Sequence, residues 1–312
     1  MDPYHDFRVF YNQNIYPELV NLERRRRRLI RLIGLSALLL SAVVAFQAYV
    51  GIFLVTLLVL IPAGIGVTYL AHQVGVYYLE FKPRIVELIL DFLDNDVNYR
   101  ELRYKPKGGI PKKTFLASKI FTRADVYHAE DLITGWVREL PFEMCEVDAR
   151  EFSPSRNRLD RVFRGVFVRG DFYRADMLGS VLILPDAYRK YLSRSERAFH
   201  RLGGRRVTKQ LLGEFEAVFD TYATPNVRVR DILSEDLQRA ILRFRERFLK
   251  VNKQKDIYLS IIEDNVYLAL SHPKNLLEPS LWRSTVSFEV VQEFHDDIRL
   301  LLEILSELDV LN

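Results

Sequence analysis

The sequence predicts an α+β membrane protein: a two-helix transmembrane hairpin near the N-terminus, followed by a cytoplasmic domain of mixed helices and antiparallel strands. Two observations carry this prediction. Residues 32–79 contain no Asp, Glu, Lys or Arg, although 28% of the 312 residues are charged. The rest of the chain alternates between strand patterns of period two and helical patterns. A composition with 49% hydrophobic and 12% aromatic residues excludes a largely disordered or collagen-like chain.

The uncharged stretch is long enough for two membrane spans. The hydrocarbon core of a bilayer is about 30 Å thick and needs roughly 20 apolar residues per helix. Residues 32–50 supply one span and residues 52–71 a second, so residues 32–71 are predicted to form the hairpin, with a tight turn near Gly51. Residues 1–31 are expected to form an amphipathic lead-in helix on the cytoplasmic side.

The orientation of the hairpin is predicted from basic residues, which stay on the cytoplasmic side of a membrane. Lys82 and Arg84 follow the second span, and the turn has no charge. The first span is preceded by six arginines: Arg24, Arg25, Arg26, Arg27, Arg28 and Arg31. We therefore expect a multi-pass protein of the cytoplasmic membrane with both termini in the cytoplasm. An alternative is that the arginine run belongs to a twin-arginine export signal, but the second apolar span argues against a cleaved leader.

Residues 72–312 are predicted to form the cytoplasmic α+β domain. A helix over 72–94 is expected to continue out of the membrane, and Glu130 and Asp131 are expected to begin another, because acids favour a helix N-terminus. The later patterns predict strands over 142–147, 161–168, 180–184 and 214–222, a helix capped by Ser234, a hairpin of 257–262 with 266–270, and an amphipathic final helix through Val290, Phe294, Ile298 and Leu305.

The sequence contains no motif that names a chemistry. There is no phosphate-binding loop, no nucleophile elbow and no dinucleotide fingerprint, and the six histidines lack the spacing of metal ligands. Cys145, the single cysteine, lies beside Glu146 on a predicted strand, where we expect a buried structural thiol with a raised pKa. No cofactor or metal is expected. The near balance of 45 basic and 41 acidic residues does not favour nucleic acid as a partner.

Two groups of residues form a candidate interaction or anionic-ligand site. Arg161 and Arg164 lie near Asp171 and Asp176 in the sequence, where they are expected to form ion pairs or, alternatively, a pocket for an acidic ligand. Glu278 and Trp282 mark either a partner-docking corner, since Trp is enriched in binding hot spots, or a tryptophan that packs the final helix onto the sheet.

An ordered set of short blocks also resembles a known family. The blocks are Phe10-Tyr11, Ile15-Tyr16-Pro17, Leu22-Glu23, Phe115, Ser118, Phe121, Tyr127, Glu130-Asp131-Leu132, Gly135, 162–167, Asp171-Phe172, 215–219, Tyr222, Ile232-Leu233, Ser260-Ile261, Tyr267-Leu268-Ala269 and 278–281. Together they resemble the bacterial membrane-protein family called domain of unknown function 3137. The resemblance implies a bacterial inner-membrane location and a cytoplasmic domain. It implies no catalytic residues, and Cys145 stands where a small polar residue is expected.

The favoured hypothesis is a membrane-tethered cytoplasmic interaction or regulatory module without catalysis. Its partners would be the lipid bilayer and another membrane or cytoplasmic protein. A first alternative is an enzyme that acts on lipid headgroups or nucleotides at the membrane face, through the neighbourhood of Arg161, Arg164 and Asp171. A second alternative is a subunit of a transport complex, which would require oligomerisation because two apolar spans cannot line a pore alone.

Overall fold

The chain forms two compact units in a computed structural model that describes residues 3–50, 53–171, 179–186, 192–251, 256–271, 281–282, 284 and 286–309. A helical unit comprises Met1–Phe92 with Leu277–His295, and a sheet unit comprises Leu93–Leu276 with Asp296–Asn312. The structure confirms a mixed α+β fold with an antiparallel sheet and a long apolar helix near the N-terminus.

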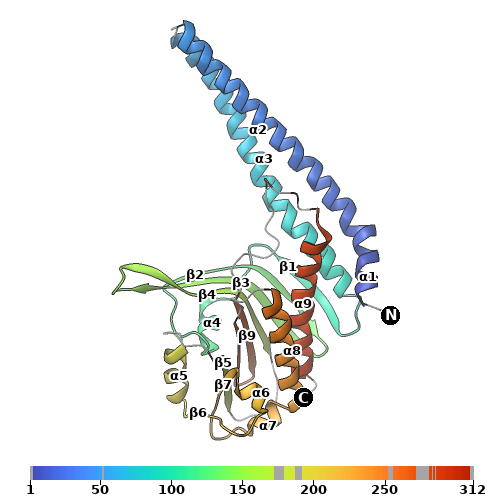
Figure 1. Ribbon diagram of the computed structural model, residues 1–312, viewed down its shortest axis with the longest axis vertical. Helices are drawn as coiled ribbons and strands as arrows, with labels where there is room; N and C mark the ends of the chain where they lie inside the picture. The colour runs from blue at the N-terminus through green and yellow to red at the C-terminus, as the bar shows by residue number, and fades with distance from the viewer. Residues whose placement is uncertain are drawn as a thin grey trace. The chain divides into compact units, whose positions relative to one another are not determined.

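The helical unit is built from one long helical path and its antiparallel neighbour (Figure 1). Helix α1 (Pro3–Phe10) continues through a π-helical turn (Tyr11–Ile15) into α2 (Tyr16–Val50). Helix α3 (Phe53–Leu93) contains both the predicted second span and the predicted helix after it, so the expected boundary at residue 72 falls inside one helix. Ion pairs of Arg25 with Glu80 (2.6 Å) and Arg84 with Glu18 (3.5 Å) join the charged halves of α2 and α3.

The charged half of this unit has its own hydrophobic core. Ile15 and Leu19 on the first helical path and Ile85 and Ile89 on α3 are fully buried. The Phe7 ring stacks on His295 in α9 (Phe288–Asp309) at a centroid distance of 3.9 Å, so the first turns of α9 belong to this core. The periodic apolar residues of these helices therefore pack on one another.

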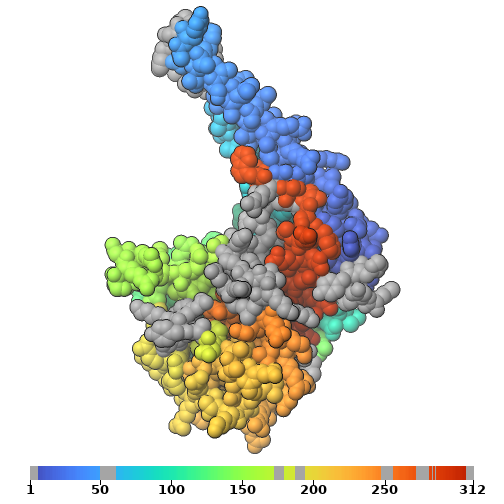
Figure 2. Space-filling view, in the orientation of Figure 1, coloured from blue at the N-terminus to red at the C-terminus, as the bar shows by residue number. Residues whose placement is uncertain are grey.

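The apolar half of α2 has the opposite character. Large side chains there are exposed, and Leu38 and Tyr49 keep 71% and 91% of their accessible surface. In Figure 2, no other segment covers the side of α2 that faces the viewer along this half. Within the described residues, one helix has the length and composition needed to cross a membrane. It comprises Asp6–Tyr49. The second predicted span lies in α3, and its crossing stays a prediction.

The sheet unit contains nine strands, within the described residues, in the order β1-β2-β3-β4-β9-β8-β5-β7-β6, with every pair antiparallel. The strands are β1 (Tyr99–Lys105), β2 (Val126–Val137), β3 (Leu140–Ser153), β4 (Arg158–Asp171), β5 (Ser180–Pro185), β6 (Arg205–Arg206), β7 (Phe219–Ala223), β8 (Ile257–Ile262) and β9 (Asn265–Ser271). The helices are α4 (Lys112–Ala117), α5 (Leu192–His200), α6 (Gly213–Glu216), α7 (Val229–Ile232), α8 (Glu235–Val251) and the second part of α9.

Both faces of the sheet are covered. In β4, Phe163 and Phe167 point to one face, where they join a core with Phe115 and Phe121 from the segment around α4. Val166 and Val168 point to the other face and are also buried. Figure 1 shows α4 and α5 on one side of the sheet and α8 and the second part of α9 on the other. This arrangement explains why the central strands read as nearly continuous apolar runs.

Two predictions about secondary structure are wrong. Glu130 and Asp131 do not begin a helix but lie within β2, where a register shift follows Glu130 and Asp131 adopts a φ of +61°. The Tyr104 hydroxyl on β1 donates a hydrogen bond to Asp131, so pairing with neighbouring strands overrides the local helix signal. Residues 214–222 are only partly a strand, because α6 occupies Gly213–Glu216 and β7 begins at Phe219.

The other predicted elements of the sheet unit are confirmed. Ser234 caps α8 by accepting a hydrogen bond from the Leu237 amide at 3.2 Å. Strands β8 and β9 form the predicted hairpin, with Ile262 paired to Asn265. The periodic residues of the final helix lie in α9, and Ile298 and Leu305 are buried.

Candidate functional site

A charged pocket lies where the first half of β4 leaves the sheet. Strand β9 pairs with β4 only over Gly165–Asp171, so the preceding half of β4 pairs with β3 alone among the described strands. The β3–β4 hairpin, the segment before β2 and helix α5 enclose a cavity of about 340 Å³. Its lining residues are Arg123, Glu151, Phe152, Ser153, Pro154, Arg156, Asp160, Arg161, Val162 and Arg194. We call it the arginine pocket, because four of its lining residues are arginines and two are acidic.

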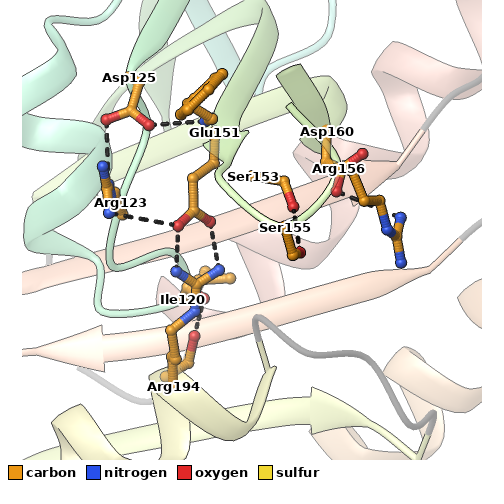
Figure 3. A network of polar contacts seen from close by, with 11 residues as sticks. Ile120, Arg123, Asp125, Glu151, Ser153, Ser155, Arg156, Asp160 and Arg194 are labelled. Carbon is orange, nitrogen blue, oxygen red and sulfur yellow. Dashed lines mark hydrogen bonds and ion pairs between the residues drawn. The ribbon is translucent and has the colours of Figure 1, made fainter. Parts of the chain in front are cut away.

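Glu151 anchors one wall of the arginine pocket (Figure 3). Both of its carboxylate oxygens accept hydrogen bonds from Arg194 on α5, in a bidentate arrangement. Arg123 approaches the same carboxylate at 3.8 Å and donates to Asp125 at 3.1 Å. Hydrogen bonding from Arg194 lowers the pKa of the Glu151 carboxyl, and the charge of Arg123 acts in the same direction. The pair is strong because a guanidinium fork matches a carboxylate.

Backbone contacts hold this wall in place. The Asp125 carboxylate accepts a hydrogen bond from the Phe152 amide at 2.7 Å, and the Asp125 amide donates to the Arg150 carbonyl. On α5, the Ser195 hydroxyl donates to the Ile120 carbonyl at 2.6 Å. The three segments of the wall are therefore tied by hydrogen bonds as well as by charge.

The opposite wall carries looser ion pairs. Arg156 meets Asp160 at 3.3 Å, and Asp160 also accepts a shorter contact of 2.9 Å from Arg158. Arg161 lies 3.7 Å from Asp148. The side chains of Arg156 and Arg161 are about half exposed or more, as is that of Arg123 on the other wall.

The structure brings Arg161 and Arg164 together through a β-bulge. Residues three apart would face opposite sides of a regular strand. Here Ala149 pairs with Phe163 while Arg150 pairs with Arg161, so Val162 is the extra residue of the bulge. Both arginines consequently lie on the face of Asp148. The pKa of the Asp148 carboxyl is lowered, first by a hydrogen bond from Arg150 and then by the charges of Arg161 and Arg164.

Asp171 is not part of this cluster. It lies at the far end of β4, opposite Asn265, and accepts a hydrogen bond from Arg169 at 2.5 Å. Seven residues of extended strand separate it from Arg164, or roughly 23 Å. The expected pairing of Asp171 with Arg161 and Arg164 is therefore absent, and Asp148 takes that place. Asp176 lies outside the described residues.

The structure describes only one of the two residues of the predicted partner-docking corner, Glu278 and Trp282. Glu278 lies outside the described residues. Trp282 belongs to the helical unit and keeps 74% of its surface exposed, so the interpretation that it packs the final helix onto the sheet is wrong. The neighbouring Leu281 is buried instead.

The predicted membrane-orienting arginines are not equivalent. Arg26 is buried and forms a bidentate ion pair with buried Glu23, with both contacts at 2.7 Å. Its remaining nitrogen donates to the Leu281 carbonyl at 2.6 Å. Arg27 shares Glu23, and Arg25 pairs with Glu80. Arg24, Arg28 and Arg31 are exposed.

Cys145 has the environment of a structural cysteine. Cys145 is buried, its sulfur accepts a long contact from the Ile110 amide, and burial raises the pKa of its thiol to about 12, with Glu143, Glu146 and Asp131 adding to the shift. No group of three or more His, Cys, Asp or Glu side chains that could hold a metal ion occurs within the described part of the chain.

Removal of the Glu151 charge provides a test of this wall. Glu151→Gln is expected to cost about 2 kcal/mol of unfolding free energy, because hydrogen bonds to charged groups contribute roughly 1.5–3 kcal/mol. Since the folded pKa of Glu151 is lowered, its contribution is complete above its unfolded pKa of about 4.3 and is lost as the pH falls through the folded value. Urea unfolding at several pH values below neutrality should show this component in the wild type and not in Glu151→Gln. Equal pH profiles would contradict the prediction.

Sequence reasoning identified one lining residue of the pocket, Arg161, and missed Glu151 and Arg194. These two residues lie 43 positions apart, and no local pattern links them. A charged residue at the end of an alternating strand, such as Glu151, is ordinarily a solvated position, so the sequence alone offers no signal for the pair.

The fold is therefore that of an α+β protein with one antiparallel sheet, a charged pocket at its hairpin and a long apolar helix. Residues 161–310 match the family model described as "Protein of unknown function (DUF3137)". This match confirms the family resemblance from β4 through α9. The blocks between Phe10 and Gly135 lie outside the matched residues. No curated protein and no solved structure gives a significant match to the chain.

Proposed function

We propose that the protein is a membrane-tethered interaction or regulatory module, anchored by α2 and α3 as a transmembrane hairpin with both ends in the cytoplasm. The bilayer would hold the helical unit, and the sheet unit would present its surface to another membrane or cytoplasmic protein. A bacterial cytoplasmic membrane is the location that this proposal assigns.

One observation carries the membrane part of the proposal. Large apolar side chains are exposed along both helices, including Leu35 (64%) and Val44 (64%) on α2 and Ile61 (65%) and Ile65 (68%) on α3. A soluble protein rarely exposes so large an apolar surface to water. In a bilayer the same surface would lie in the apolar hydrocarbon core. The polar Ser41 and Thr68 hydroxyls donate to the carbonyls of Ala37 and Gly64 in their own helices, which suits an apolar solvent.

The orientation rests on the arginines that remain free to face lipid headgroups. The charge of Arg26 is neutralised by buried Glu23, so it adds little to the positive bias. Arg24, Arg28 and Arg31 are exposed beside the start of the apolar stretch. Short basic segments next to a span favour the cytoplasmic side, so these residues support a cytoplasmic N-terminal segment.

Thiol accessibility would test the topology. Ala48→Cys should react with a membrane-impermeant maleimide in intact bacterial cells, and Arg24→Cys should react only after permeabilisation. The native Cys145 is buried, so unmodified protein supplies the matched background. Full-length protein should also resist carbonate extraction from membranes. Labelling of Arg24→Cys in intact cells, or carbonate release, would contradict the hairpin and its orientation.

Binding of a protein partner is tested separately from membrane insertion. Affinity purification of tagged full-length protein from native membranes, followed by mass spectrometry, is expected to recover a stoichiometric protein partner. Turnover by the purified protein, abolished by one substitution, would instead refute a module without catalysis.

The arginine pocket favours a second candidate function, the binding of an anionic group such as a phosphate on a lipid headgroup or nucleotide. Four arginines, Arg123, Arg156, Arg161 and Arg194, line a cavity of about 340 Å³. The test is calorimetric titration with inorganic pyrophosphate. Saturable binding that is lost in an Arg156→Ala, Arg161→Ala double variant would support an anion site, and the single variant Arg158→Ala is a control because Arg158 is not among the lining residues.

A further inference from the structure

Trp282 stands at a defined position on the helical unit because its neighbour is held on both sides. The Leu281 carbonyl accepts a hydrogen bond from Arg26 on α2 at 2.6 Å. The Leu281 amide donates to the hydroxyl of Tyr78 on α3 at 3.2 Å. The Leu281 side chain is 6% exposed, so backbone and side chain together fix this point of the chain against both helices.

The indole of Trp282 is nevertheless left uncovered. Its exposed fraction is 74%, although Trp is highly buried on average in folded proteins. The adjacent residue, Leu281, contributes the buried anchor, so Trp282 is not needed for packing in the helical unit. An exposed indole on a fixed backbone is available to an interface that is apolar on one side and wet on the other.

This point lies at the water-facing border of the headgroup layer of a bilayer that surrounds the apolar halves of α2 and α3, within reach of a Trp side chain. Arg26 precedes Leu32, the first residue of the predicted span, by about 9 Å along the helix, and Tyr78 follows Ala71 by about 10 Å. Side chains on a helix tilt toward its N-terminus, and this tilt brings the Tyr78 hydroxyl closer to the apolar half of α3. The headgroup layer is roughly 5–8 Å thick on each side of the hydrocarbon core.

Exposed side chains at the charged end of the apolar halves of α2 and α3 have the composition of a membrane interface. Tyr69 and Leu79 on α3 are exposed by 60% and 67%, and Tyr78 is 37% exposed. Arg24 and Arg28 on α2 are exposed as well. Aromatic residues concentrate at the headgroup level, and basic residues beside a span attract anionic lipids, at about 1 kcal/mol each. This composition favours lipid over a protein partner as the cover for Trp282.

We propose that Trp282 inserts its indole into the headgroup layer of the cytoplasmic leaflet and thereby anchors Leu281 and the helices that hold it at the membrane surface. Leu281 positions the indole, and Arg26 and Tyr78 position Leu281. This inference rests on the proposed membrane insertion of α2 and α3, and it assigns to the soluble end of the helical unit a lipid contact outside the spans themselves.

Fluorescence quenching by brominated lipids tests the contact. The chain has two tryptophans, so Trp136→Phe leaves Trp282 as the single emitter. Full-length Trp136→Phe protein would be reconstituted in vesicles of phosphatidylcholine and phosphatidylglycerol, with bromines placed either near the headgroup end or near the tail end of the acyl chains. We expect emission to fall by roughly half with bromines near the headgroup and less with bromines near the tail end.

The outcomes separate this inference from the proposed function. Carbonate-resistant protein with unquenched Trp282 would overturn the lipid contact and leave the hairpin standing, and carbonate release from the vesicles would overturn both. Trp282 that is shielded from acrylamide in native membranes but not in purified vesicles would also overturn it, because a protein would then be the cover.

Two further variants test the positioning role of Tyr78 and the background quenching from Trp136. Tyr78→Phe, in the Trp136→Phe background, removes the acceptor for the Leu281 amide and should reduce the quenching without releasing the protein from vesicles. Trp282→Phe leaves only Trp136 on β2 and measures the quenching that arises elsewhere in the chain. Unchanged quenching in the Tyr78→Phe variant would contradict the positioning role.

Discussion

Phe115→Ala is expected to destabilise the sheet unit by about 3–5 kcal/mol, the range for removing a fully buried aromatic side chain from a core. Phe115 on α4 is completely buried. Its ring stacks on Phe121 at 4.8 Å and meets Phe167 edge-on at 5.0 Å. Truncation would leave a cavity between α4 and the sheet that the surrounding strands, held by their ladders, cannot close.

Urea unfolding of the full-length protein in detergent would measure this loss. Trp136 on β2 reports on the sheet unit, because its ring stacks under the Arg100 guanidinium at 5.2 Å. Phe152→Ala provides the matched control, since Phe152 is 41% exposed and its truncation should change the unfolding free energy by less than about 1 kcal/mol. Equal midpoints for the two variants would show that α4 does not contribute to the core as described.

Arg26→Ala is expected to cost the helical unit about 3–5 kcal/mol, the usual effect of removing one partner of a buried ion pair. The side chains of Arg26 and Glu23 are each 8% exposed. Without Arg26, the Glu23 carboxylate keeps only Arg27, whose side chain is largely exposed, and the Leu281 carbonyl loses its donor. The buried Glu23 charge, left with only one exposed partner, accounts for most of the expected loss.

The exposed pair on the same helices is the control. Arg25→Ala removes a contact of 2.6 Å to Glu80, but both side chains are about half exposed, so water and salt screen the pair and the loss should stay below about 1 kcal/mol. Emission of Trp282 in the Trp136→Phe background would follow the unfolding. The double variant Glu23→Gln, Arg26→Met should recover much of the lost stability, because it removes both buried charges. A loss no larger than that of Arg25→Ala would refute the buried pair.

The Arg26 pair changes how the arginine run is understood. From charge alone, six arginines before the first span have one role, to keep that end in the cytoplasm. In the structure, Arg26 turns inward to Glu23 and holds Leu281, which is 255 positions away along the chain. One member of a topology signal is thus also a structural residue that joins the two chain segments of the helical unit.

Local sequence patterns were sufficient to predict the elements in which the tertiary environment favours the same structure as the pattern. The final helix follows its apolar period through α9, Ser234 caps α8, and the short polar turn after Ile262 joins β8 to β9. Each of these depends on residues only a few positions apart. Glu130 and Asp131 show the limit, because their helix signal is also local but pairing with β3 and contact with Tyr104 decide otherwise.

The candidate site was only partly predictable for the same reason. Arg161 and Arg164 were identified as charges on an alternating strand, but their shared face depends on the bulge at Val162, which requires the register with β3. Glu151 and Arg194 meet because α5 packs beside the hairpin, and Asp171 is distant because β4 is extended between Arg164 and Asp171.

The apolar stretch after Leu32, the mixed α+β class, the period of most elements and the family resemblance from β4 onward could all be predicted from the sequence, because composition and periodicity are properties of neighbouring residues. The burial of Arg26, the exposure of Trp282 and the four arginines that line one pocket are visible only in the folded structure. These features depend on contacts between residues tens to hundreds of positions apart, and such contacts exist only once the helices and strands have packed.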